Sequence, residues 1–214
     1  MKIIRKNYSL IISLVFWILM VGGFSDNWLT NIEQETNYVP KFIIHGILAF
    51  TWYTLLVIQP LLISFKKPAF HMKLGLFGII VFYSMVLSVI FLHLFPYESD
   101  PAQLIMINSA KAQMILGVFL VSQGFLKRIK DIEKHRIFIL FGTFCLMQPS
   151  IDRFTGNFLV DLNLFGLADM IPWLLIYTIL FLSFIWYSKK ITWYMIVWFI
   201  IWFFYLYTLI KFYN

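Results

Sequence analysis

The sequence contains a single cysteine, Cys145, which lies within an apolar run. One cysteine excludes an intrachain disulfide and a cluster of thiolate metal ligands. Charged residues are also scarce, at 13% of the chain against 61% hydrophobic residues. Because soluble domains typically carry about 25% charged residues, this composition excludes a soluble domain of ordinary kind and indicates an integral membrane protein.

Seven apolar runs reach or approach the roughly 20 residues that a helix needs to cross a bilayer. We predict an all-α polytopic membrane protein with seven transmembrane helices, in which helices 2–5 form a four-helix core. The chain is interpreted as one integral membrane domain over residues 1–214, with core helices over 42–151, an amphipathic outer segment over 154–170 and a C-terminal helical hairpin over 171–210. The predicted spans are residues 8–24, 42–64, 72–95, 103–126, 136–151, 171–188 and 191–210, of which the fifth is short.

The charges set the expected orientation. Thirteen of the 17 basic residues fall in the segments on one side of the predicted helices, and eight of the 10 acidic residues fall on the other. The positive-inside rule then predicts a cytoplasmic N-terminus and an external C-terminus. The net charge of +7 would suggest nucleic acid for a soluble protein. Here anionic lipid headgroups account for the short basic loops, so we expect membrane lipids as partners and no nucleic acid.

The first apolar run allows two interpretations. The basic residues before it are typical of a signal peptide as well as of a first helix. The segment Val21-Gly22-Gly23-Phe24-Ser25 lacks a clear pattern of small residues for cleavage. We therefore favour a retained helix.

Polar side chains within membrane helices mark candidate sites, because they normally face the bundle interior. His45, Trp52 and Gln59 of the second span are spaced seven residues apart. A step of seven residues turns a helix by only about 20° from the starting face, so these residues predict one polar stripe. The alternative is that Trp52 is ordinary packing and that Gln59 precedes a break at Pro60.

The four histidines fall into two expected pairs. His71 and His93 lie 22 residues apart, about 33 Å along a helix, and therefore near opposite membrane surfaces. His45 should share the outer depth with His93, and His71 should share the cytoplasmic depth with His135. Neutral imidazole binds haem iron and metals and also relays protons. The pairs therefore allow haem or metal binding, whereas a single histidine at a helix end is more often an interfacial hydrogen-bonding residue.

Further polar residues in spans four and five predict an outer polar cavity. Asn108 and Lys111 lie within the fourth span, where Lys111 either extends its amine to the surface or meets an acid in the cavity. Asp152 is the expected partner. Pro149 predicts a broken end of the fifth helix, and the polar residues beside it suit a small polar ligand. They are Gln148, Asp152 and Arg153.

The same residues resemble a group of bacterial predicted membrane proteins of unknown function. That group has a histidine on one helix, His-Arg-x-Leu-Gly at the start of the next, and His-Arg near the start of a later helix that ends in arginine. The resemblance covers about 110 residues, with Lys73 in place of the arginine, and implies location in the bacterial cytoplasmic (inner) membrane. The core is more distantly similar to transmembrane b-type cytochromes, although helix 4 has no histidine. The matching residues are His45-Gly46, His71-Met72-Lys73-Leu74-Gly75, His135-Arg136 and Arg153.

Two functions remain from the sequence. One is a protein that holds haem b, or a metal whose identity is open, through His45, His93, His71 and His135, for electron transfer or redox sensing. The alternative is a non-catalytic small-molecule carrier or accessory subunit with an outward-facing polar cavity. A zinc hydrolase is disfavoured because no His-x-x-x-His motif is present. No residue is assigned a catalytic role, and an enzyme is the less favoured interpretation.

Overall fold

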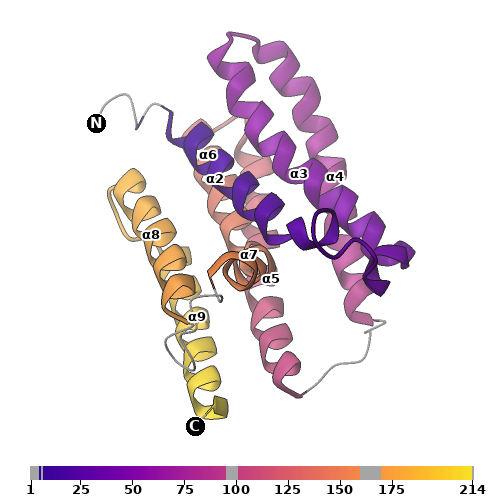
Figure 1. Ribbon diagram of the computed structural model, residues 1–214. Helices are drawn as coiled ribbons and strands as arrows, with labels where there is room; N and C mark the ends of the chain where they lie inside the picture. The colour runs from indigo at the N-terminus through magenta and orange to yellow at the C-terminus, as the bar shows by residue number, and fades with distance from the viewer. Residues whose placement is uncertain (1–4, 6, 95–100, 160–169, 214) are drawn as a thin grey trace. The chain divides into compact units, whose positions relative to one another are not determined.

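The structure is a computed structural model that describes residues 5, 7–94, 101–159 and 170–213, with the side chains at 93, 101–110, 159, 170 and 208–213 outside the description. All regular structure in these ranges is helical (Figure 1). The elements are α2 Tyr8–Gly23, η1 Ser25–Asn27, η2 Glu35–Tyr38, α3 Pro40–Ser64, α4 Pro68–Leu94, α5 Pro101–Lys127, α6 Ile132–Cys145, α7 Gln148–Leu159, α8 Met170–Ser188 and α9 Trp193–Tyr213.

The predicted helices correspond to observed ones, and the starts differ for a local reason. α3, α4 and α5 begin with Pro40, Pro68 and Pro101, a few residues before the predicted apolar runs. A proline at the first helical position loses nothing, because the N–H it lacks has no partner within the helix. Each proline therefore starts its helix before the sequence becomes strongly apolar.

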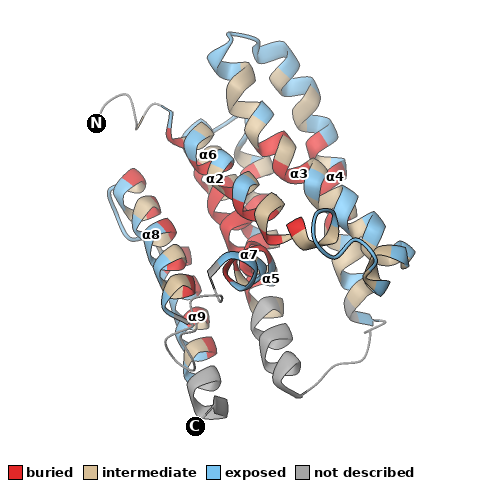
Figure 2. Cartoon of the chain, viewed as in Figure 1, coloured by how far each residue is buried: buried red, intermediate tan, exposed pale blue. Residues whose placement is uncertain are grey.

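Three of the described helices have the length and apolarity of membrane spans. Among the described residues, α3, residues 68–92 of α4 and residues 171–188 of α8 are each long and apolar enough to cross a bilayer. The bent pair α6–α7 would be a fourth span if counted as one. Large apolar side chains on α3 and α4 are exposed, among them Ile47 at 61% and Ile80 at 65% (Figure 2). Such surfaces suit contact with lipid rather than water.

Two compact units divide the chain. The first contains residues 1–96 and 150–173, and the second contains residues 97–149 and 174–214. The first unit therefore holds α2, α3, α4 and most of α7. The second holds α5, α6, α8 and α9.

In the first unit, α3 and α4 form an antiparallel hairpin (Figure 1). Its turn is only three residues long, because Lys66 adopts a left-handed conformation with φ 56°. α2 packs on α3, where the Trp17 indole N–H donates to the Thr54 hydroxyl at 3.1 Å. Phe16 of α2 is fully buried, so this helix contributes to the core of the unit.

The second unit combines close helix contact with an aromatic core. α5 and α6 approach at Gly117 and Gly142, where a Cβ on either glycine would lie less than 3.0 Å from the carbonyl oxygen of the other. Small residues allow such close approach between membrane helices. Beside this contact, buried aromatic rings from α6, α8 and α9 pack together. They include Phe141, Phe144, Tyr177, Phe184 and Trp198.

The fifth predicted span requires a correction. The prediction of a single helix over 136–151, broken near its end by Pro149, is wrong. α6 already ends at Cys145, and a second helix, α7, begins at Gln148. The two helices differ in direction by 54°. Pro149 lies in the first turn of α7, where its missing N–H is harmless, and therefore helps to start the second helix. The prediction of a break was right, but its position and the role of the proline were not.

Candidate functional site

The C-terminal end of α2 forms a polar site with α7. A Cβ on Gly23 would overlap the carbonyl oxygen of Ser150, and one on Gly22 would lie 2.8 Å from the Phe154 ring. These two glycines thus permit α7 to lie directly against the end of α2. The side-chain amide of Asn157 donates to the Gly23 carbonyl at 3.1 Å, which satisfies an acceptor that the helix end leaves without a helical partner.

Arg153 of α7 lies at the centre of this site. Its guanidinium stacks over the Phe24 ring, 4.8 Å from the ring centroid. The same nitrogen, Nη1, contacts Asp26 Oδ2 at 3.5 Å and Asn27 Oδ1 at 3.4 Å. No hydrogen bond joins Nη2 or Nε of Arg153 to a described residue, and 45% of the side chain is exposed. We call Phe24, Asp26, Asn27, Arg153 and Asn157 the Arg153 cluster.

Asn27 is itself held in place by the surrounding loop. Asn27 Oδ1 accepts from Gln34 Nε2 at 2.7 Å, and the Asn27 carbonyl accepts from Asn37 Nδ2 at 2.8 Å. Asp26 is partly buried, and its Oδ1 atom has no hydrogen-bond partner in the described part of the chain. The Asn27 acceptor for Arg153 is therefore held by other bonds, whereas the Asp26 carboxylate keeps one oxygen without a described partner.

Asp152, the neighbour of Arg153, has a different partner. The Trp173 indole N–H donates a short hydrogen bond to Asp152 Oδ1. The pair predicted between Lys111 and Asp152 joins residues of different units and stays a prediction. Lys111 itself is half-buried.

The stripe of His45, Trp52 and Gln59 faces α4, as the spacing of seven predicts. His45 Nδ1 lies 2.9 Å from the Ser88 hydroxyl oxygen. The Trp52 ring lies 4.8 Å from that of Phe82, measured between centroids, and is 3% exposed. α3 continues through Pro60 to Ser64, so the break considered at Pro60 does not occur.

Gln59, His71 and Gly75 form a hydrogen-bonded group at one end of the stripe. The bonding pattern sets the Gln59 amide nitrogen toward His71 Nδ1 at 2.5 Å and its oxygen toward the Gly75 N–H at 3.0 Å. His71 Nδ1 also lies 3.3 Å from the backbone carbonyl oxygen of Gln59, so it contacts both the side chain and the backbone of this residue.

The contacts of His45 and His135 place the proton of the neutral ring on Nδ1. Ser88 donates its only hydroxyl hydrogen to the Met85 carbonyl at 2.6 Å, so His45 Nδ1 must donate to Ser88. His135 Nδ1 lies 2.8 Å from the Gly124 carbonyl, which can only accept. In both neutral rings Nε2 therefore holds the lone pair that a metal would use.

A second polar group lies inside the second unit. Gln113 and Gln148 are 0% and 2% exposed, and Gln113 Nε2 donates to Gln148 Oε1 at 2.9 Å. The Trp198 indole N–H donates to Gln113 Oε1 at 3.2 Å. This chain of bonds connects α5, the start of α7 and α9 within the aromatic core.

Several of these positions escaped sequence analysis. Phe24, Asp26, Asn27 and Gln113 were not predicted as site residues. The pair Gly22-Gly23, three residues before Asp26, was an available signal for close backbone approach. The predicted residues His93 and Asn108 lie outside the described side chains, and the described residues contain no group of three His, Cys, Asp or Glu side chains that could hold a metal.

Comparison with models of known protein families, with curated proteins and with solved structures finds no match. The resemblance to bacterial predicted membrane proteins, and the more distant one to b-type cytochromes, stays a prediction. Geometry is therefore the basis for assigning a function.

Proposed function

We propose that this protein is a multi-pass protein of the bacterial cytoplasmic membrane that binds a small anionic molecule at the Arg153 cluster without transforming it. In the proposed topology of seven helices, with the N-terminus cytoplasmic, residue 153 lies on the outer side. The protein would then act as a carrier or accessory subunit that presents this molecule at the membrane surface.

The observation that carries the proposal is the one-sided anchoring of Arg153. Both polar contacts use Nη1, while the ring of Phe24 supports the guanidinium plane. Nη2 and Nε form the edge of the guanidinium that can bind a carboxylate or phosphate through two parallel hydrogen bonds. Because the group is already oriented, little side-chain entropy would be lost when an anion binds.

Thermal unfolding of the purified full-length protein tests this proposal. Small carboxylates or inorganic phosphate should raise the Tm where chloride at equal ionic strength does not. Binding at a hundred times Kd would stabilise the protein by about 2.7 kcal/mol. Arg153→Gln should abolish the effect, and Arg153→Lys should weaken it because the two-pronged contact is lost.

Arg128→Gln is the matched control, because it removes an arginine from the turn between α5 and α6. It should leave the anion effect intact. An equal loss in the Arg128 and Arg153 variants, or stabilisation by no anion tested, would refute the proposal.

Haem or metal binding is the second candidate function, and the tautomers of His45 and His135 favour it. Both present an unprotonated Nε2, with Nδ1 held by a hydrogen bond, which is the usual arrangement of a ligating histidine. His71 Nδ1 instead contacts both the side-chain amide and the backbone carbonyl of Gln59. Bound haem b would supply one-electron chemistry, and the predicted outer pair, His45 with His93, would hold its iron.

Absorbance and metal analysis of protein expressed with added haem test this candidate. We expect a Soret band that His45→Ala removes and His71→Ala, at the opposite membrane surface, preserves. Protein without either a Soret band or bound metal would eliminate it. This result would leave the anion-binding proposal unaffected.

A further inference from the structure

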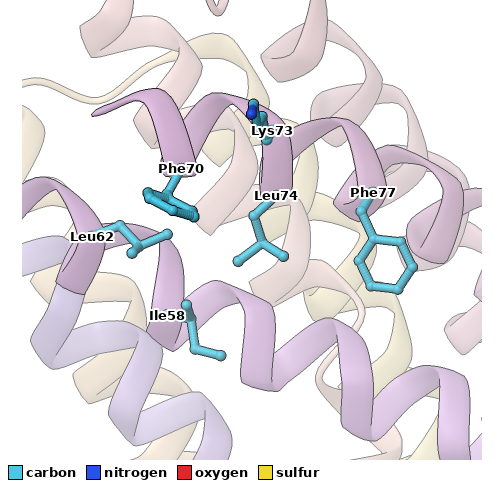
Figure 3. Close-up of a pocket in the computed structure, with 6 residues that line it drawn as sticks. All are labelled: Ile58, Leu62, Phe70, Lys73, Leu74 and Phe77. Carbon is cyan, nitrogen blue, oxygen red and sulfur yellow. The ribbon is translucent and has the colours of Figure 1, made fainter. Parts of the chain in front are cut away.

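A groove runs between α3 and α4 on the first unit (Figure 3). Ile58 and Leu62 of α3 form one wall, and α4 supplies the other. The groove has a volume of about 350 Å³ and is open to the surroundings. The α4 residues that line it are Phe70, Lys73, Leu74 and Phe77.

The groove combines an apolar interior with a single charge. Five of its six lining side chains are apolar, and Lys73 is the sixth. Phe70 and Phe77 flank Lys73 along α4 and are 65% and 49% exposed. Seven residues of helix separate these two rings, or about 10 Å, so the groove follows the helix direction.

Positive charge near this groove has no acidic partner among the residues that the structure describes. Lys66 and Lys67 lie in the turn that precedes α4, one helical turn from Phe70. No acidic residue occurs between Glu35 and Glu98. Among the described residues, none of Lys66, Lys67 and Lys73 forms an ion pair. An anionic ligand could therefore supply a counter-charge here.

We propose that this groove binds one anionic phospholipid, with an acyl chain between α3 and α4 and the headgroup at Lys73, Lys66 and Lys67. Lipid tails are as apolar as the groove, so apolar contact alone provides little preference for one lipid over another. The groove accommodates the acyl chain, and the lysines select lipids with an anionic headgroup. Attraction to an anionic headgroup corresponds to about a fivefold preference for each lysine close to it.

Native mass spectrometry of the full-length protein, released from micelles, tests the site. Phosphatidylglycerol and phosphatidylcholine with identical acyl chains are supplied in equal amounts. The wild-type protein should retain one phosphatidylglycerol about fivefold or more in excess of phosphatidylcholine. Lys73→Gln should reduce that excess by about fivefold.

Lys130→Gln is the matched control, since this lysine lies in the exposed turn before α6. It should leave the ratio unchanged. Leu74→Trp, which fills the groove, should reduce retention of both lipids and preserve their ratio. Equal retention of the two lipids by the wild type, or equal effects of Lys73→Gln and Lys130→Gln, would overturn the proposal. Thermal unfolding of each variant verifies that it is folded.

Discussion

At the scale of single residues, glycines determine how closely the chain segments meet. Gly23 has no space for a side chain, because its Cβ would overlap the Ser150 carbonyl oxygen and lie 3.2 Å from the Phe154 nitrogen. Both atoms belong to backbone, which cannot rotate away as a side chain could. Gly46 differs, because a Cβ there would have no heavy atom within 4 Å. Gly23 is therefore required for close packing, whereas the position of Gly46 has space for a side chain.

Gly23→Ala should therefore destabilise the protein by about 1–3 kcal/mol, the usual range for overpacking. Gly46→Ala should stabilise it by about 0.5–1 kcal/mol, because alanine favours the helix over the flexible unfolded chain. Thermal unfolding in detergent measures both. Similar Tm values for the two variants would contradict the close contact of α2 with α7.

Asp131 caps α6 through two contacts with Lys134. Its side chain accepts from the Lys134 backbone N–H at 3.0 Å, and its Oδ2 lies 2.8 Å from Lys134 Nζ. The hydrogen bond from the Lys134 side chain, followed by that from its backbone, holds the pKa of Asp131 below its ordinary value of 3.8. The cap therefore stabilises the folded protein above this pH and less as the pH falls through the lower folded value.

Asp131→Asn retains a capping side chain but no titrating carboxylate. Between about pH 6 and about pH 3, its Tm should consequently fall less than that of the wild type. Glu133→Gln, in the same turn, serves as the control. A wild-type pH profile for the Asp131 variant would show that this carboxylate does not contribute.

At the scale of elements, the buried glutamines bind three helices together. Gln113 of α5 receives the Trp198 N–H of α9 and donates to Gln148 at the start of α7. The surrounding side chains are largely aromatic, so each of these polar groups would lack a partner if Gln113 were lost. Leaving a buried polar group unpaired costs about 1–3 kcal/mol.

Gln113→Leu should thus destabilise the protein by about 1–3 kcal/mol. The double variant Gln113→Leu with Gln148→Leu should lose less than the sum of the two single variants, because removing both partners leaves fewer unpaired groups. Gln123→Leu, at a half-buried position of α5, is the control. Additive losses would show that the two glutamines act independently.

At the scale of the whole molecule, charge asymmetry predicts the topology. The turns between α3 and α4, α5 and α6, and α8 and α9 all carry basic residues, and each is short. Short basic loops stay in the cytoplasm. Reporter fusions at Lys67, Lys130 and Lys190 should consequently all report a cytoplasmic location. One external result among them would refute the proposed orientation.

The sequence by itself determined the helices. Apolar runs with charged or proline ends placed six of the seven predicted helices within about four residues of the bounds of observed helices, because backbone hydrogen bonding and apolarity in a helix are local properties. The spacing of His45, Trp52 and Gln59 also determined a shared face, since helical periodicity is local too.

Tertiary structure decided which side chains meet. His45 faces Ser88, Asp152 accepts from Trp173, and Gln113 joins Trp198, and no local pattern indicates these partners. A partner depends on the rotation and depth of another helix, which are set by contacts such as that of Gly23 with α7. The break between Cys145 and Gln148 has the same origin. The last carbonyl groups of α6 and the first N–H groups of α7 need partners from elsewhere in the fold, and the sequence does not specify where these partners lie.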